Sequence, residues 1–176
     1  MGLKMPNTYT LISSNVLSTT AASVTFSAIP STYTDLVLRV SIRGNGTQTP
    51  DAGVLNINSN GSSNFSSTYL RGTGSAANSA RDTAAASAYA FNNQWTGSTS
   101  NTFGSTEIYI PNYAVTGGKP ISSFTVTEDN ATAAYLAVMA MYSSLTSAIT
   151  SLTLSSAFSN SFVSGSSFYL YGIKNS

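Results

Sequence analysis

The sequence TDLVLRVSIR, residues 34–43, alternates apolar and polar side chains almost without a break. Successive side chains of a β-strand point to opposite faces, so this alternation separates a buried face from a solvated one. The buried set would be Leu36, Leu38, Val40 and Ile42, and Val37 is the only apolar residue on the other face. The stretch therefore predicts a half-buried strand.

The same alternation recurs along the rest of the chain. Short apolar alternations, each bounded by Asn, Gly, Ser or Pro, occupy residues 24–26, 55–57, 108–110, 124–126 and 152–154. We expect further strands at residues 9–12, 69–71, 135–142 and 168–173. No stretch has the apolar stripe of a normal helix, and residues 72–88 are interpreted as a long polar loop. Asn60-Gly61 is predicted to reverse the chain between Ile57 and Phe65.

Short strands at fairly even spacing favour an all-β fold, an antiparallel β-sandwich. The immunoglobulin type would place a core Trp between two cysteines, but this chain has one Trp and no Cys. We therefore predict a jelly-roll-like sandwich of about eight strands in two sheets. Residues 8–176 would form this single domain, and residues 1–7 would form an N-terminal arm.

The chain has few charged side chains and neither His nor Cys. Charged residues make up 7% of the sequence, against roughly 25% in an average soluble domain. With 41% hydrophobic residues, 10 Tyr and 8 Phe, the chain can still bury a core, so we expect it to fold. Charge usually keeps sheet edges and apolar faces apart, and its scarcity is typical of a protein packed among neighbours.

The charge balance and the apolar runs argue against two kinds of partner. A net charge of +1 provides no attraction for a phosphate backbone, so we expect no nucleic acid partner. The longest apolar run, residues 133–142, is about half as long as a membrane-spanning helix, so we expect no membrane insertion. The N-terminus has no apolar stretch of signal-peptide length, so we expect no export by that route.

Residue types that usually perform catalysis or bind metals are scarce. Without His or Cys, acid–base chemistry would fall mainly to six carboxylates. Glu107 and Glu128 are the most plausible pair for glycoside hydrolysis, but solvated charges on strand faces explain them better. Glu128, Asp129 and Asn130 could supply oxygen ligands to Ca²⁺, but a turn with capping side chains explains them better. We therefore expect no enzyme, no metal site and no cofactor.

The sharpest local feature is the run AAYLAVMAMY, residues 133–142, which is apolar on both faces if it forms a strand. One face can meet the sandwich core, and the other needs cover from a long loop or a neighbouring subunit. We take the second face as the candidate oligomer interface; its residues are Tyr135, Ala137, Met139 and Met141.

Aromatic and amide side chains often line surfaces that bind carbohydrate or protein. Tyr89, Asn92 and Trp95 lie in sequence typical of an exposed loop, and Tyr113 follows Pro111 at a strand end. The rings either cap the sandwich core or form a contact surface. The candidate glycan contacts are therefore Tyr89, Asn92, Trp95 and Tyr113.

Five stretches resemble small virion structural proteins of tailed bacteriophages, especially aquatic and cyanobacterial ones. They are TYTLI (8–12), SVTF (23–26), IPSTYTDLVL (29–38), EIYIPNY (107–113) and SSFYLYGIKNS (166–176), and they span nearly the whole chain. The resemblance implies a jelly-roll-like structural protein, commonly a homotrimer. It implies a place on the capsid or in the tail fibre or receptor-binding apparatus, and no catalytic residues.

On this basis we expect a capsid decoration (cement) protein on the outer capsid surface of the virion, with itself and the major capsid protein as partners. The candidate capsid anchor lies in the N-terminal arm, at Leu3, Lys4, Met5 and Pro6. The alternative is a tail-fibre or tail-tip receptor-binding protein that contacts host-surface glycan through the aromatic and amide residues named above.

Overall fold

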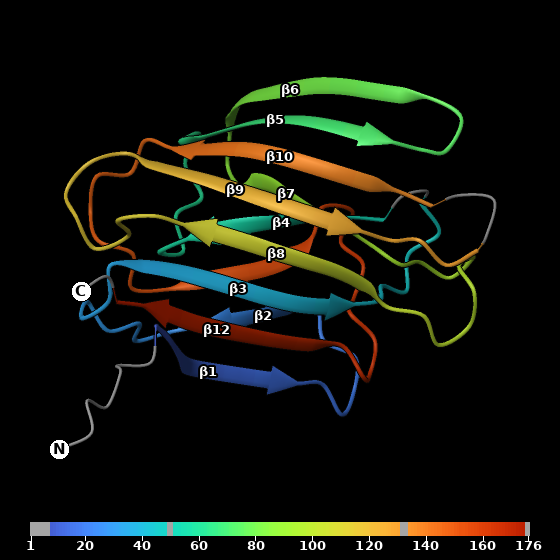
Figure 1. The fold of residues 1–176 in the computed structure, drawn as a ribbon, viewed down its shortest axis with the longest axis horizontal. Helices are drawn as coiled ribbons and strands as arrows, with labels where there is room; N and C mark the ends of the chain where they lie inside the picture. The colour runs from blue at the N-terminus through green and yellow to red at the C-terminus, as the bar shows by residue number, and fades with distance from the viewer. Residues whose placement is uncertain (1–7, 49–50, 131–133, 175–176) are drawn as a thin grey trace, which may run out of the picture.

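The computed structural model of this chain describes residues 8–48, 51–130 and 134–174. In these residues, twelve β-strands form two antiparallel sheets (Figure 1). The described residues contain no helix. The strands are β1 (Tyr9–Val16), β2 (Ser23–Phe26), β3 (Asp35–Ile42), β4 (Asp51–Ile57), β5 (Phe65–Gly72), β6 (Ala77–Ala85), β7 (Ala88–Asn93), β8 (Gly104–Ile110), β9 (Lys119–Val126), β10 (Leu136–Ser143), β11 (Leu152–Ser156) and β12 (Ser167–Ile173). The large sheet has the order β1-β12-β3-β8-β9-β10-β5-β6, and the small sheet has the order β2-β11-β4-β7.

Eight of the twelve strands have the connectivity of a jelly roll. They form four antiparallel pairs, β1 with β12, β2 with β11, β3 with β8, and β4 with β7. In a jelly roll, a ribbon of four such pairs is rolled up, and successive pairs along the ribbon alternate between two layers. This arrangement produces the strand orders β1-β12-β3-β8 and β2-β11-β4-β7. The predicted antiparallel, jelly-roll-like sandwich is therefore confirmed. The remaining strands, β9, β10, β5 and β6, extend the large sheet.

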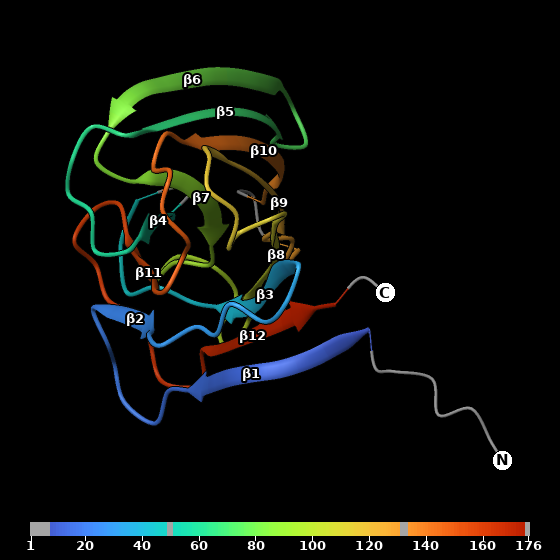
Figure 2. The ribbon, with the colours of Figure 1, turned by 90° about the vertical axis from the view of Figure 1, so that its left-hand side faces the viewer.

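The core forms where the inward faces of the two sheets meet. On β3, the apolar positions of the alternation, Leu36, Leu38, Val40 and Ile42, are buried as expected, but the other face is exposed only at Arg39, because Asp35 and Val37 are buried as well. The same alternation buries one side of β8 and of β9. The large sheet curls around the small one, so that β10 and β5 pack over β7 (Figure 2).

The prediction of a long polar loop at residues 72–88 is wrong, because most of this segment forms β6 (Ala77–Ala85). This strand lies at the edge of the large sheet and takes its backbone hydrogen bonds from β5. Its side chains are exposed on both faces except at Ala85, so burial imposes no alternation on its sequence. A strand that needs no apolar face leaves no apolar pattern to detect.

The chain reversal predicted at Asn60-Gly61 occurs slightly earlier and has a different role. Asn58 and Ser59 both have φ of 53°, and the N–H of Asn60 donates to the carbonyl of Ile57 at 3.1 Å. Positive φ at two central positions is the geometry of a type I′ turn. The reversal leads from β4 in the small sheet to β5 in the large sheet, so it joins the two layers and does not close a hairpin.

Candidate interaction surface

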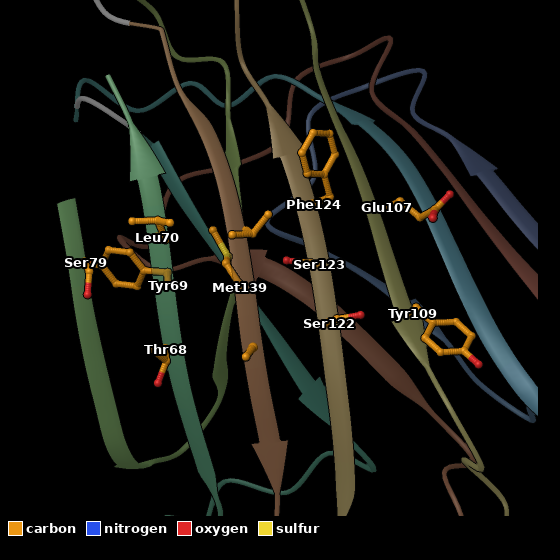
Figure 3. Close-up of a pocket in the computed structure, with 12 residues that line it drawn as sticks. Thr68, Tyr69, Leu70, Ser79, Glu107, Tyr109, Ser122, Ser123, Phe124 and Met139 are labelled. Atoms are coloured by element: carbon orange, nitrogen blue, oxygen red, sulfur yellow. The ribbon is translucent and has the colours of Figure 1, made fainter. Parts of the chain in front are cut away.

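A row of side chains crosses four neighbouring strands on the outer face of the large sheet. Glu107 of β8 lies opposite Phe124 of β9, Phe124 lies opposite Val138 of β10, and Val138 lies opposite Leu70 of β5. Residues opposite each other in antiparallel strands point to the same side of the sheet, so the four side chains share one face. Figure 3 shows Glu107, Phe124 and Leu70 in this arrangement.

Large apolar side chains gather at this end of the sheet and remain about half exposed. The exposed fractions are 53% for Leu70, 49% for Phe124, 52% for Leu136, 47% for Val138 and 48% for Tyr142. We call these five residues the apolar face. Leu70, Phe124, Leu136 and Val138 are neighbours in register, and Tyr142 follows on β10 beyond Ala140. Scattered exposed apolar residues are normal on a protein surface, whereas a group gathered on one face is typical of an interaction surface.

No charged side chain lies on the outer face of β5, β9 or β10. The paired outward positions are Ser66, Thr68, Leu70 and Gly72 on β5, Pro120, Ser122, Phe124 and Val126 on β9, and Leu136, Val138, Ala140 and Tyr142 on β10. The adjacent carboxylate of Glu107 is paired with Arg39, with 2.8 Å between Nη2 and Oε2. Arg81 of the edge strand β6, opposite Thr68, also belongs to the outer face. Covering the apolar face without this edge strand therefore requires little desolvation of charge.

A shallow trough of about 630 Å³ lies over this outer face (Figure 3). Its floor contains small side chains that lie opposite one another in register, Ser122, Ala140 and Thr68. Phe124 and Leu70 stand along one side of it. A protruding apolar side chain of a partner could enter this trough.

A second exposed apolar group lies at the opposite end of the same sheet. On the edge strand β1, Tyr9 is 49% exposed, Leu11 is 51% exposed and Val16 is 59% exposed. Leu11 lies opposite Tyr171 of β12, Tyr171 lies opposite Val37 of β3, and this row continues to the outer face of β8. The register of β1 places Tyr9 and Val16 on the same outer face. We call Tyr9, Leu11 and Val16 the β1 patch.

The oligomer interface predicted on β10 was placed on the wrong face of the strand. Ala137, Met139 and Met141 are at most 4% exposed and belong to the sandwich core, while Tyr135 is half-buried just before the strand. They are buried because this face of β10 packs over β7 of the small sheet. The outward face is the alternate set, which includes Leu136 and Val138.

The residues predicted to contact glycan are not brought together in an exposed loop. Tyr89 and Asn92 belong to β7, and Asn92 is only 1% exposed. Tyr113 is fully buried, where its hydroxyl donates to the carbonyl of Pro30 and burial raises its pKa. Trp95 is half-buried. Two of the four are therefore excluded as surface contacts, because their rings and amides fill the interior.

The other sequence predictions are tested only in part. The candidate capsid anchor, Leu3, Lys4, Met5 and Pro6, lies outside the described residues. The Glu128 carboxylate accepts a 3.0 Å hydrogen bond from the N–H of Asn130, as in a turn with a capping side chain. Within the described ranges, no group of three or more His, Cys, Asp or Glu side chains is placed to hold a metal ion. The same ranges contain no helix long and apolar enough to cross a membrane.

The fold and this surface together define a jelly-roll β-sandwich with an extended sheet that exposes an uncharged apolar face. No protein-family model, curated protein or solved structure matches this chain.

Sequence reasoning missed Leu70, Phe124 and Tyr142 as surface residues. The signal that could have found them is the two-sided apolar pattern of β10, which requires cover beyond the core.

Proposed function

We propose that this protein is a bacteriophage capsid decoration (cement) protein, which assembles as a homotrimer on the outer surface of the capsid shell. The observation that carries the proposal is the uncharged apolar face of Leu70, Phe124, Leu136, Val138 and Tyr142. An isolated protein gains nothing from exposing such a surface, whereas an assembly component uses it to bury apolar area.

Two separate apolar groups on one sheet suit a cyclic assembly. In a ring of identical subunits, each contact joins one patch of a subunit to a different patch of its neighbour. The apolar face and the β1 patch lie at opposite ends of the large sheet; between them, one row holds the ion pair of Arg39 and Glu107, and the neighbouring row holds Tyr171 and Val37. The apolar face of one copy would therefore cover the β1 patch of the next.

Stabilisation of the shell would follow from mass action. A trimer that binds only the assembled lattice favours that lattice over its separated subunits, by about 2.7 kcal/mol at a free concentration of 100 Kd. The shell would then resist the internal pressure of packaged DNA better. No bond is made or broken, which agrees with the scarcity of catalytic residue types in this sequence.

The oligomeric state tests the role of the apolar face. Sedimentation equilibrium should give a trimer for the unaltered protein and a folded monomer for Val138→Asp, because a charge at this position would have to be desolvated in the interface. Ser100→Asp, at an exposed loop position, is the matched control and should remain a trimer. A monomeric unaltered protein, or a trimeric Val138→Asp variant, would contradict the proposal.

The position in the virion tests the role itself. A decoration protein should be present in far more copies per particle than a tail tip can hold, and particles that lack it should lose their contents at a lower temperature. Low copy number with unchanged capsid thermostability would instead favour the alternative, a tail-fibre or tail-tip receptor-binding protein. Quantitative mass spectrometry of purified virions, together with heat-release assays, distinguishes the two.

A further inference from the structure

Two oppositely charged side chains line a hollow on the inner side of the large sheet. Arg71 of β5 and Asp82 of β6 border a space of about 460 Å³ between the end strands of the large sheet and the edge of the small sheet. Figure 2 shows β5 and β6 lying above β7 and β4. The other lining residues are Gln48, Ala52, Tyr69, Tyr89 and Phe158.

Most other charged side chains in the described chain have contacts that serve the fold. Arg43 and Lys119 donate hydrogen bonds to backbone carbonyls. Asp51 is buried and accepts hydrogen bonds from side-chain amides. Arg39 and Glu107 pair with each other. In a sequence with only 7% charged residues, a charge without such a role is a specific feature.

Arg71 and Asp82 differ from these in that they face the same space without pairing with each other. No ion pair within 4.0 Å joins them in the part of the chain that the structure describes, although their strands are neighbours. The Arg71 guanidinium lies over the rings of Tyr69 and Tyr135, 5.5 and 5.6 Å from the ring centroids, and its Nε is buried without a hydrogen-bond partner. Asp82 is exposed. The hollow is thus bordered by a guanidinium held against aromatic rings and by a separate, exposed carboxylate.

Aromatic rings complete the wall of the hollow. The rings of Tyr69 and Tyr89 lie 5.1 Å apart, and the Tyr89 hydroxyl donates a hydrogen bond to Oδ1 of the buried Asn92. Burial raises the pKa of Tyr89 to about 12, so this hydroxyl stays protonated at neutral pH. Phe158, by contrast, is 48% exposed at the border of the hollow. The Phe158 side chain is therefore partly accessible to a ligand.

We propose that this hollow binds a neutral saccharide. The opposite charges of Arg71 and Asp82 offset each other, so neither an anion nor a cation gains a net attraction. A sugar supplies both kinds of polar group that the hollow needs, because its hydroxyls donate to the Asp82 carboxylate and accept from the guanidinium. Its apolar C–H face can pack on Phe158, and the volume lies within the range of small-ligand sites. This inference does not rest on the proposed capsid role.

The test uses the unaltered full chain and a panel of neutral saccharides that end in glucose, galactose, mannose or N-acetylglucosamine. Saturation-transfer NMR and a glycan array should detect binding of at least one of them. Asp82→Asn and Phe158→Ala should each weaken that binding roughly tenfold, the loss expected when a charged hydrogen bond or a packed ring is removed. Both positions are exposed, so the unfolding temperature should stay unchanged.

Arg81→Gln is the matched control, because this neighbouring charge lies opposite Thr68 and so belongs to the outer face. Its saccharide binding should equal that of the unaltered protein. The proposal is overturned if no neutral saccharide binds, if only sialylated or phosphorylated glycans bind, or if Asp82→Asn and Phe158→Ala bind as well as the unaltered protein. Trimer formation is a separate readout, so failure here leaves the capsid proposal standing.

Discussion

Val138 and Met139 are consecutive residues of β10 with opposite surroundings, since Val138 is 47% exposed and Met139 is 3% exposed. Met139 belongs to the core cluster, on the side of β10 that packs over β7. Val138 lies between Phe124 and Leu70 on the outer face. One strand thus supplies both the interior of the sandwich and the surface that we propose for assembly.

Truncation of these two neighbours should separate folding from assembly. Met139→Ala should lower the free energy of unfolding by about 2–5 kcal/mol, because it leaves a cavity in the core. Val138→Ala should lower it by less than about 1 kcal/mol in the monomer, because it removes a half-exposed side chain. Urea denaturation at low protein concentration measures both. Equal losses would show that the two faces of β10 are not distinguished as described.

The contact between Gly53 and Phe91 should make Gly53→Ala destabilising. A Cβ atom on Gly53 would lie 1.8–2.5 Å from three atoms of the Phe91 ring, so β4 or the buried ring would have to move. We expect a loss of about 1–3 kcal/mol in urea denaturation, as for other overpacked cores. Gly61→Ala is the control, because nothing lies within 4 Å of its added Cβ, and it should be neutral or slightly stabilising. Equal free energies of unfolding for Gly53→Ala and Gly61→Ala would contradict the proposed clash with Phe91.

The raised pKa of Tyr89 should make stability fall at alkaline pH. Burial is the main cause, and it raises the pKa from 10.0 to about 12. The folded protein therefore holds this proton more tightly than the unfolded chain does. The contribution is fully present below pH 10 and is lost as pH rises through about 12. Urea denaturation in steps from pH 9 to pH 12 should show the loss.

Tyr89→Phe provides the comparison for this pH dependence. The phenylalanine variant has no hydroxyl to ionise at this position, so its free energy of unfolding should fall less steeply between pH 10 and pH 12. Parallel curves for the two proteins would mean that Tyr89 titrates normally.

The carboxylates of Asp35 and Glu107 should differ in their importance to the fold. Asp35 is 5% exposed and accepts 2.9 Å hydrogen bonds from the Tyr109 hydroxyl and from the N–H of Asn112. Asp35→Ala leaves these donors unsatisfied and should cost about 1–3 kcal/mol. Glu107→Ala breaks only an exposed ion pair with Arg39 and should cost less than about 1 kcal/mol. Thermal unfolding of both variants decides the order, and the reverse order would contradict this assignment.

The candidate surface was only partly predictable from the sequence. The alternation of residues 34–43 identified β3, because side chains of a strand point to its two faces with a period of two, but it did not show that Asp35 and Val37 on the second face are buried as well. β6 was not predictable, because its exposed side chains carry no such constraint. For β10, the sequence indicated that both faces are apolar, but not which face is buried. That choice depends on β7, which is far away along the chain.

The sequence by itself determined the all-β class and the sandwich, because strand alternation and turn residues are local properties that each segment carries alone. Only the tertiary structure decided that Met139 is covered while Val138 is exposed, and that Arg71 and Asp82 border one hollow. The physical reason is that exposure and proximity depend on which distant strands lie alongside. Strand pairing sets those neighbours, and no single segment specifies them.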